Sequence, residues 1–199
     1  YSTGLAKATL ANSSKAQLDV LTSSSNEYAV TVTDTSIAAS DANAINAKTT
    51  GLVTFDATAI TGALSDVKAL YEANVAGTVA ALGNEAVTIS DTGTVKAADI
   101  NFVNSNTSGS FVANKVTTIT GTVDEVKATY AAYASGTVTG LGNEAITIVD
   151  LGTTVTTAVL NDLKALTTGS VTVSLSGTTI AATDLNNLDA ESTESVNAG

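Results

Sequence analysis

The chain repeats part of itself at a constant offset. Residues 60–91 recur as residues 119–150, 59 positions later, and 19 of the 32 paired positions are identical. Both copies contain, in order, Ile-Thr-Gly, Val-Lys-Ala, Tyr, Gly-Thr-Val and Leu-Gly-Asn-Glu-Ala, and both end on Asp. A repeated supersecondary unit is typical of arrays in which each unit buries its apolar face against its neighbours. The repeat therefore favours an extended surface or fibre over a single catalytic pocket.

The composition restricts the kind of core that the repeat can build. Of the 199 residues 44% are hydrophobic but only 4% are aromatic, and the net charge is −11 with eight lysines. Small aliphatic side chains suit a thin, regularly stacked core. The acidic excess makes nucleic acid and anionic membrane surfaces poor partners, because phosphate binding needs a basic patch. The sequence has no run of 18 apolar residues, so we expect no membrane insertion.

Six residue types are missing altogether: Cys, Met, His, Trp, Pro and Arg. Without Cys and His the chain lacks thiolate metal ligands, disulfides and the commonest general base, and we therefore predict no enzyme and no required cofactor. A sulfur-free chain resists oxidation, which suits a product left outside the cell. Tyr1 is not a translation start, so we expect the chain to have been processed or cut from a longer one.

Short strands are predicted where Val or Ile alternates with Thr or Ser, at residues 29–33, 86–89 and 170–174. Alternation places the branched aliphatic side chains on one face, and we expect that face to form the core. The residues expected there are Val30, Val32, Val87, Ile89, Ile146, Ile148, Val171 and Val173.

Short helices are predicted to follow the strands. Leu64, Val67 and Tyr71 form an apolar stripe at helical spacing. The stripe recurs at Val123, Val126 and Tyr130, and again at Leu160, Leu163 and Leu166. We expect Val67, Tyr71, Val126 and Tyr130 to clamp the helices onto the strands. Ser40 and Thr183 are the predicted N-caps. Gly51, Gly109 and Gly169, each preceded by Thr-Thr or Thr-Ser, are predicted to end helices as left-handed caps.

The apolar residue that opens each of these patterns recurs with two alternating spacings. The openings are Ile37, Ile60, Val95, Ile119, Val155 and Ile180, separated by 23, 35, 24, 36 and 25 residues. We therefore expect a short coil to alternate with a long one. A strand, a turn and a short helix in each coil predict a β-rich α/β repeat solenoid with short parallel strands. Tandem small β-sandwich domains are the alternative fold.

The predicted organisation is a single repeat array over residues 1–190. Its units are expected at about residues 22–59, 60–118 and 119–179, with a partial unit at 180–190, and residues 191–199 form a polar tail or linker. Neither end shows the polar cap that solenoids need for solubility. We expect the ends either to stack on other copies or to continue in a longer array.

The repeated motifs resemble a known class of protein. The patterns Ile-Thr-Gly, Gly-Thr-Val, Leu-Gly-Asn-Glu-Ala and Ala-Ala-Asp-Ile-Asn, over about residues 22–190, are similar to tracts in giant repetitive extracellular proteins of cyanobacteria and other aquatic bacteria. The resemblance implies a secreted, acidic, sulfur-poor protein associated with cell surfaces, adhesion or extracellular matrix. The calcium-binding nonapeptide of related secreted proteins, Gly-Gly-x-Gly-x-Asp, is not found in this sequence.

Three aspartates are the candidate metal ligands. Asp34, Asp91 and Asp150 each follow a predicted strand and begin a turn. Carboxylates stacked along one edge of an array could bind Ca²⁺, which takes six to eight oxygen ligands. The alternative is an Asx-turn, in which each side chain accepts a hydrogen bond from its own turn.

Two other patterns look catalytic at first sight. Glu85 and Glu144 occupy the same position in the two Leu-Gly-Asn-Glu-Ala segments. Because they are copies one repeat apart, we interpret each as the solvated flank of a tight turn and not as half of a glycosidase pair. Ser65 and Lys68 have the Ser-x-x-Lys spacing of an acyl-transfer nucleophile, but the next copy has Asp124 in place of the serine. We expect both to lie on a solvated helix surface.

Thr-x-Thr pairs occur at residues 31–33 and 137–139. Ranks of such pairs on a flat sheet bind ice in some solenoids, but here the pairs do not recur in every unit. We attribute them to strand propensity.

The functional hypothesis that best fits these features is a structural one. We expect a self-associating repeat protein of an extracellular bacterial filament, matrix or surface layer, whose main partner is itself. The alternative is the repeat arm of a surface adhesin or phage fibre that binds a glycan or cell surface, for which the exposed Tyr133 and the Asn-rich loops are the pointers.

Overall fold

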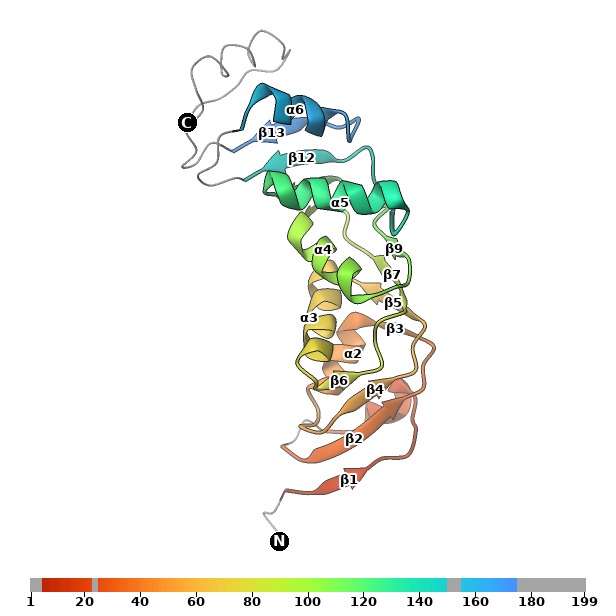
Figure 1. Cartoon of the computed structure of the whole chain (residues 1–199). Helices are drawn as coiled ribbons and strands as arrows, with labels where there is room; N and C mark the ends of the chain where they lie inside the picture. Colours follow the sequence, from red (N-terminus) through yellow and green to blue (C-terminus); the bar gives the residue numbers. More distant parts are fainter. Residues whose placement is uncertain (1–4, 23–24, 150–154, 175–199) are drawn as a thin grey trace.

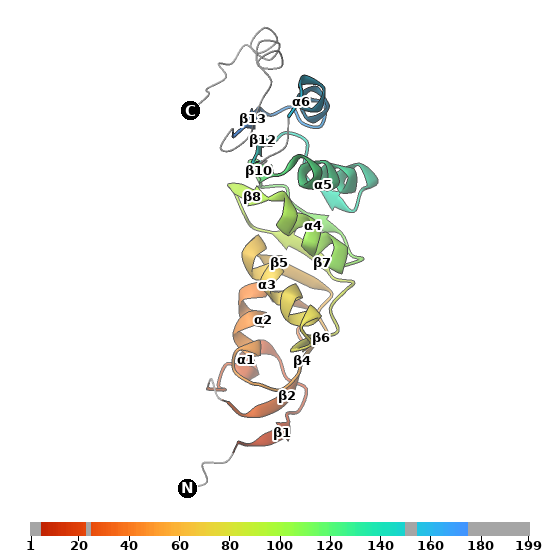
Figure 2. The same cartoon turned by 60° about the vertical axis from the view of Figure 1, so that its left-hand side comes forward.

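The computed structural model describes residues 5–22, 25–149 and 155–174. These residues form an elongated stack, with strand β1 at one end and helix α6 and strand β13 at the other (Figure 1). Successive helices pack on one another along one side of the stack, and the strands run along the other side (Figure 2). The fold is a mixed α/β fold with three sheets of parallel strands and six helices in the described residues.

The elements are short. The strands are β1 (Lys7–Thr9), β2 (Glu27–Val32), β3 (Ser36–Ala38), β4 (Val53–Phe55), β5 (Ala59–Gly62), β6 (Val79–Ala80), β7 (Ala86–Ile89), β8 (Thr94–Lys96), β9 (Phe111–Val112), β10 (Thr118–Gly121), β11 (Val138–Thr139), β12 (Ala145–Ile148) and β13 (Val171–Val173). The helices are α1 (Lys15–Leu18), α2 (Ala39–Asn46), α3 (Leu64–Val75), α4 (Ala97–Asn106), α5 (Val123–Ser135) and α6 (Thr157–Lys164).

Every strand ladder between these elements is parallel. The first sheet has the order β1-β2-β4-β6, the second β3-β5-β7-β9-β11, and the third β8-β10-β12-β13. The predicted parallel strands are confirmed. The β-sandwich alternative would require antiparallel ladders, and the described strands form none.

The ladders also correct the expected alternation of short and long coils. We use coil for the stretch from a strand residue to its partner in the next strand of the same sheet. Ile60 pairs with Val87, 27 residues on, and Val95 pairs with Ile119, 24 residues on. The 35-residue spacing from Ile60 to Val95 is therefore not one coil: it is a 27-residue coil followed by a lateral step of eight residues from β7 to β8. The 59-residue repeat is two coils plus this step.

The lateral step moves the chain from one sheet to the next. β7 pairs with β5 below and β9 above in the second sheet, while β8, which follows it, opens the third sheet. The first sheet ends at β6, after the long helix α3. Each pair of coils is thus displaced sideways by one strand relative to the pair before it.

The core lies between the strands and the helices and consists mostly of aliphatic residues, with a few buried aromatic side chains such as Tyr71 and Phe111. Of the strand residues predicted to form it, Val30, Val32, Val87, Ile89, Ile146 and Ile148 are buried, as are the helix residues Val67, Tyr71, Val126 and Tyr130. Burying each Val or Ile contributes about 1.5–3 kcal/mol. The prediction is wrong for Val171 and Val173, which are only half-buried, because β13 is the last strand of its sheet in the described residues.

Helix starts were predicted less well than helix faces. Ser40 lies inside α2, which begins at Ala39 with Ala38 as its N-cap, and Thr183 lies outside the described residues. A full capping box occurs instead at α5. There the Glu125 carboxylate accepts from the Thr122 N–H at 2.9 Å, and the Thr122 hydroxyl accepts from the Glu125 N–H at 3.3 Å.

Ala81 provides a test of the repeat geometry. It follows β6 with φ of 65°, and the equivalent position in the next repeat is Gly140, with φ of 83°. A left-handed alanine is strained, so Ala81→Gly is expected to raise the free energy of unfolding by about 1 kcal/mol. Gly140→Ala adds the same strain and brings a Cβ to 2.7 Å from the Asn114 Cα, and we expect it to lower that free energy by about 2–4 kcal/mol. Urea unfolding curves measure the free energy of unfolding of both variants. Changes of the same sign in the two variants would contradict the structural equivalence of Ala81 and Gly140.

Candidate functional site

The sites that recur in this structure are the junctions between coils. Three of them, after α2, α4 and α6, contain a turn of sequence Thr-Thr-Gly or Thr-Ser-Gly that lies against the preceding coil. We call residues 49–51, 107–109 and 167–169 the junction turns. In each, the first threonine donates its hydroxyl hydrogen to a carbonyl oxygen of the coil below: Thr49 to Tyr28 at 2.9 Å, Thr107 to Glu85 at 2.8 Å and Thr167 to Glu144 at 2.7 Å. The glycine N–H then donates to the same threonine oxygen at 3.0 Å in all three turns.

The glycines of the junction turns are needed for close approach, not for a left-handed cap. None of Gly51, Gly109 and Gly169 has a positive φ, so the predicted left-handed caps are wrong. A Cβ placed on Gly109 would lie within 3.0 Å of the Glu85 carbonyl, and the other two glycines meet the equivalent carbonyls as closely. A side chain at these positions would push neighbouring coils apart.

A buried tyrosine–glutamate pair lies beneath two of these turns. The Tyr71 hydroxyl donates to Glu85 Oε2 at 2.8 Å, and the Tyr130 hydroxyl donates to Glu144 Oε2 at 3.0 Å. Backbone N–H groups complete each pair: Gly83 donates to Glu85 and Gly142 to Glu144, both at 2.8 Å. The two carboxyl groups are therefore held by a helix hydroxyl and by the turn that precedes the strand.

The expectation that these glutamates are solvated is wrong. Glu85 is 0% exposed and Glu144 is 1% exposed, and Oε1 of Glu144 has no hydrogen-bond partner. The signal that could have identified them is the spacing, because Tyr and Glu lie 14 residues apart in both copies. A tyrosine on a buried helical stripe needs a partner for its hydroxyl.

Burial sets the protonation of these tyrosines. Burial in the junction raises the pKa of the Tyr71 hydroxyl well above its usual range, and the neighbouring Glu85 carboxyl raises it further. The pKa of Tyr130 is raised in the same way by burial and by Glu144. Both side chains consequently remain hydrogen-bond donors at neutral pH.

The candidate calcium ligands cap helices. Asp34 Oδ2 accepts from the Lys15 N–H at 2.5 Å, at the first residue of α1, and Asp91 Oδ2 accepts from the Leu64 N–H at 2.7 Å, at the first residue of α3. Each carboxylate thus satisfies an unpaired N–H at a helix N-terminus 19 or 27 residues earlier in the chain. In an Asx-turn the side chain would accept from a backbone N–H of its own turn, whereas these carboxylates accept from a helix elsewhere in the chain.

Asp34 and Asp91 contact different helices, and Asp150 lies outside the described residues. Within residues 5–22, 25–149 and 155–174 no three His, Cys, Asp or Glu side chains cluster as a metal site would require. Calcium binding by Asp34, Asp91 and Asp150 stays a prediction.

The Ser65–Lys68 pair lies on the surface of α3, where Ser65 is exposed. The Lys68 ammonium is 2.9 Å from Asp99 on α4 and 3.6 Å from Glu72. The hydrogen bond to Asp99 raises the pKa of Lys68, so the lysine stays protonated and is unsuited to act as a general base.

Threonines align along the outer face of the sheets more regularly than the sequence indicated. Thr120, Thr147 and Thr172 are paired in register across β10, β12 and β13. Two of these hydroxyls are bonded within the protein: Thr147 and Thr172 are bonded to each other at 3.2 Å, and Thr172 donates to the Ile146 carbonyl at 3.3 Å. These bonds link the side chains of the neighbouring strands β12 and β13.

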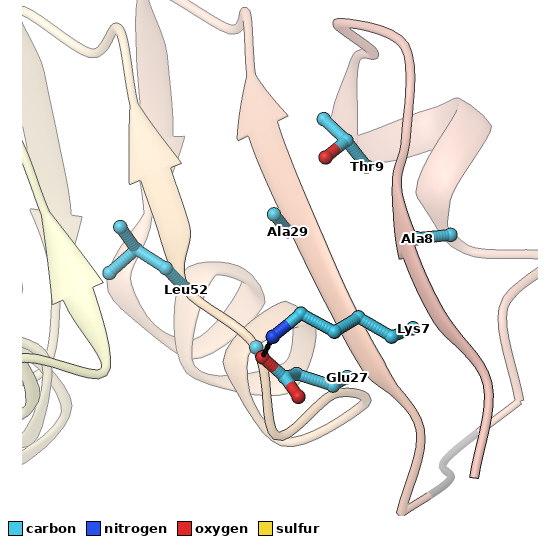
Figure 3. Close-up of a pocket in the computed structure, with 7 residues that line it drawn as sticks. Lys7, Ala8, Thr9, Glu27, Ala29 and Leu52 are labelled. Carbon is cyan, nitrogen blue, oxygen red and sulfur yellow. Dashed lines mark hydrogen bonds and ion pairs between the residues drawn. The ribbon is translucent and has the colours of Figure 1, made fainter.

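A shallow, open hollow lies on the first sheet beside β1 (Figure 3). Its lining includes the small residues Ala29 and Gly51 and the larger Leu52. The Lys7 ammonium reaches across from β1 to the Glu27 carboxylate on β2. No aromatic side chain lines it.

Comparisons with known proteins add no assignment: no protein-family model, no curated protein and no solved structure matches the chain. None of the helices in the described part of the chain is long and apolar enough to cross a bilayer.

The junction glycine can be tested against a matched control. Gly109→Ala places a Cβ against the Glu85 carbonyl and should lower the free energy of unfolding by about 1–3 kcal/mol. Gly93→Ala, in an open loop where a Cβ meets nothing within 4 Å, should change it by less than about 0.5 kcal/mol. Chemical denaturation measures the free energy of unfolding of both variants. Equal losses in Gly109→Ala and Gly93→Ala would show that the close approach at Gly109 does not contribute to stability.

The buried tyrosines should make the protein sensitive to alkali. The pKa of Tyr71 and Tyr130 is higher in the folded chain than the unfolded value of about 10. The contribution of this difference to the free energy of unfolding is therefore complete below about pH 10. It is lost as the pH rises further, since the unfolded chain then gives up protons that the folded chain retains. We expect unfolding in alkali to coincide with ionisation of both tyrosines, measured by absorbance at about 295 nm.

The double variant Tyr71→Phe/Tyr130→Phe should lose this alkaline dependence. It should also be less stable at neutral pH, by about 1–3 kcal/mol for each glutamate that loses its donor. Tyr133→Phe, at a side chain that is 39% exposed, is the control and should keep the alkaline transition. An unchanged transition in the double variant would contradict the assignment.

Proposed function

We propose that this chain is part of an α/β solenoid that serves as a structural, self-associating protein of an extracellular bacterial filament, matrix or surface layer. The observation that carries the proposal is the repeated junction. The same parallel ladder, threonine hydroxyl and close glycine contact join one coil to the next at three places along the stack. Such contacts extend in one dimension, as in repeat proteins whose units touch only their neighbours.

The contacts of the carboxylate and lysine side chains that could in principle take part in catalysis support a structural role. Glu85 and Glu144 are buried and bonded to tyrosines, Asp34 and Asp91 hold helix N-termini, and Lys68 is paired with Asp99. In each case the charged or polar group holds one part of the stack to another. We propose no enzymatic activity for this chain.

Charge and composition support the proposed setting. A net charge of −11 with no arginine disfavours nucleic acid as a partner. The absence of Cys and Met from the sequence favours an oxidising, extracellular location over the cell interior. The resemblance to giant repetitive surface proteins of aquatic bacteria supports the same setting, with other copies or adjoining repeats as the main partner.

The second candidate function is the repeat arm of an adhesin or phage fibre. Tyr133 is 39% exposed and packs edge-on against the buried Tyr130 at 6.4 Å between ring centroids. A partly exposed ring held in a fixed orientation suits contact with a sugar face.

The test is the assembly state of the purified chain across a range of concentrations, by sedimentation velocity and negative-stain electron microscopy. We expect filaments at high concentration, with a fibre-diffraction spacing of about 4.8 Å along the axis from the stacked strands. A chain that remains monomeric at every concentration, together with clear hits on a glycan array, would favour the adhesin arm instead.

A further inference from the structure

Tyrosine is the residue of this chain that a one-electron oxidant would attack. Cys, Met, Trp and His, which are the other readily oxidised residues, are missing from the sequence, and five tyrosines remain. Oxidising equivalents that reach the protein therefore go to tyrosine. The product then depends on which tyrosine ring another molecule can reach.

The tyrosines of the described residues differ in accessibility. Tyr71 and Tyr130 are buried, and the hydroxyl of each donates to a glutamate. Tyr28 is half-buried against the core. Tyr133, near the end of α5, is 39% exposed. Within residues 5–22, 25–149 and 155–174, Tyr133 is therefore the tyrosine whose ring another molecule can contact.

Tyr133 lies at the edge of the stack where the strands begin. A Cβ on Gly142, in the turn before β12, would lie 3.3 Å from the Tyr133 hydroxyl oxygen. The strands end at the opposite edge, where the Val149 N–H donates to the Gly121 carbonyl just before α5. The helix α5 crosses the stack between these two edges (Figure 1). Since an α-helix rises about 1.5 Å per residue, Tyr133 is about 15 Å from the edge at Val149.

The fold does not require a tyrosine at this position. In the other copy of the repeat the equivalent residue is Asn74 on α3. That helix packs on α2 and α4 without a ring at this position. In α5 the ring of Tyr133 packs edge-on against the buried Tyr130. The exposed ring is thus a feature of one copy of the repeat, and the stacking of coils does not explain it.

The surface around Tyr133 is uncharged, although the chain as a whole has a net charge of −11. Residues 128–149 contain one charged residue, Glu144, and it is buried. Residues 165–174, whose Thr168 N–H donates to the Gly142 carbonyl, contain none. The equivalent stretch of the first copy, residues 69–90, also carries the exposed Glu72. Two copies can therefore approach each other at Tyr133 with little of the like-charge repulsion expected from their net charge.

We infer that Tyr133 is a site of oxidative cross-linking, at which two copies of the chain are joined through their tyrosine rings. The inference rests on the self-association proposed above, because coupling needs two rings held in contact. Copies stacked along one axis would carry their Tyr133 side chains one whole chain apart. The cross-link therefore joins neighbouring stacks side by side and converts separate filaments into a covalent layer or matrix.

The oxidant is hydrogen peroxide, used by a haem peroxidase. Each Tyr133 hydroxyl loses one electron and one proton, which leaves a phenoxyl radical. The two radicals form a carbon–carbon bond between ring carbons ortho to the oxygens. The hydrogen on each of these carbons then moves to the oxygen, which restores both phenols. One peroxide molecule takes up the two electrons and two protons and leaves as two water molecules.

The test uses the full chain with Tyr1→Phe, because Tyr1 lies outside the described residues. The chain is treated with peroxide and a peroxidase under conditions in which it assembles. We expect covalent dimers on a denaturing gel, with the fluorescence of dityrosine. Tyr133→Phe should lower the dimer yield at least about tenfold, since oxidation follows exposure. Tyr28→Phe, at a half-buried ring, is the matched control and should leave the yield unchanged.

A further variant adds the site to the other copy of the repeat. Asn74→Tyr, also in the Tyr1→Phe chain, places a ring at the equivalent position of α3. Two coupling sites in each chain should extend the products beyond dimers to a ladder of longer species. Thermal melting before oxidation identifies any variant that has lost its fold.

Two results would overturn the inference and leave the self-association standing. One is dimers that persist in Tyr133→Phe or dityrosine that forms only within single chains. The other is dimers that form only after unfolding in urea, because the folded chain would then hide the ring. Sedimentation before oxidation measures the self-association separately. A chain that stays monomeric there would overturn the proposed function, and with it the cross-link between stacks.

Discussion

Neighbouring coils approach so closely at the junction turns that backbone meets backbone. Gly109 lies against the Glu85 carbonyl, which at the same time accepts a hydrogen bond from the Thr107 hydroxyl. A buried carbonyl without a partner is costly, and a Cβ at the glycine would open the gap. At these three turns the spacing of the paired strands and the burial of the core between neighbouring coils depend on this approach.

Polar groups in the junction make the stacking specific. Tyr71 and Glu85 lie on a helix and at the start of a strand, and they meet only when α3 packs on that coil in one register. Sliding the ladder by one residue would turn the apolar face outward and would leave a buried carboxyl and a buried hydroxyl without partners. Repetition of the pair at Tyr130 and Glu144 indicates that each repeat sets its own register. The lateral step after every second coil then displaces the stack sideways, so its two ends present different strands and different surfaces.

Much of the fold could be predicted because it depends on local patterns. Alternating Val and Thr identified β2, β7 and β13, and the helical stripe identified the buried face of α3 and α5. The spacing of Ile60 and Val95 was misread as one coil, because a strand that changes sheet has the same local pattern as a strand that stays in it. The burial of the glutamates and the helix-capping bonds of Asp34 and Asp91 could not be predicted for a related reason: their partners are 14 to 27 residues away, and no local rule connects them.

The sequence by itself determined the repeat, the parallel short strands, the aliphatic core and the lack of the residues on which most catalysis depends. These follow from periodicity and composition, which act within a few residues. Only the tertiary structure decided which strand pairs with which, that Gly109 is required by the neighbouring backbone, and that Glu85 is buried while Val171 is not. Burial and close approach belong to the contact between coils, and that contact exists only after the chain has stacked.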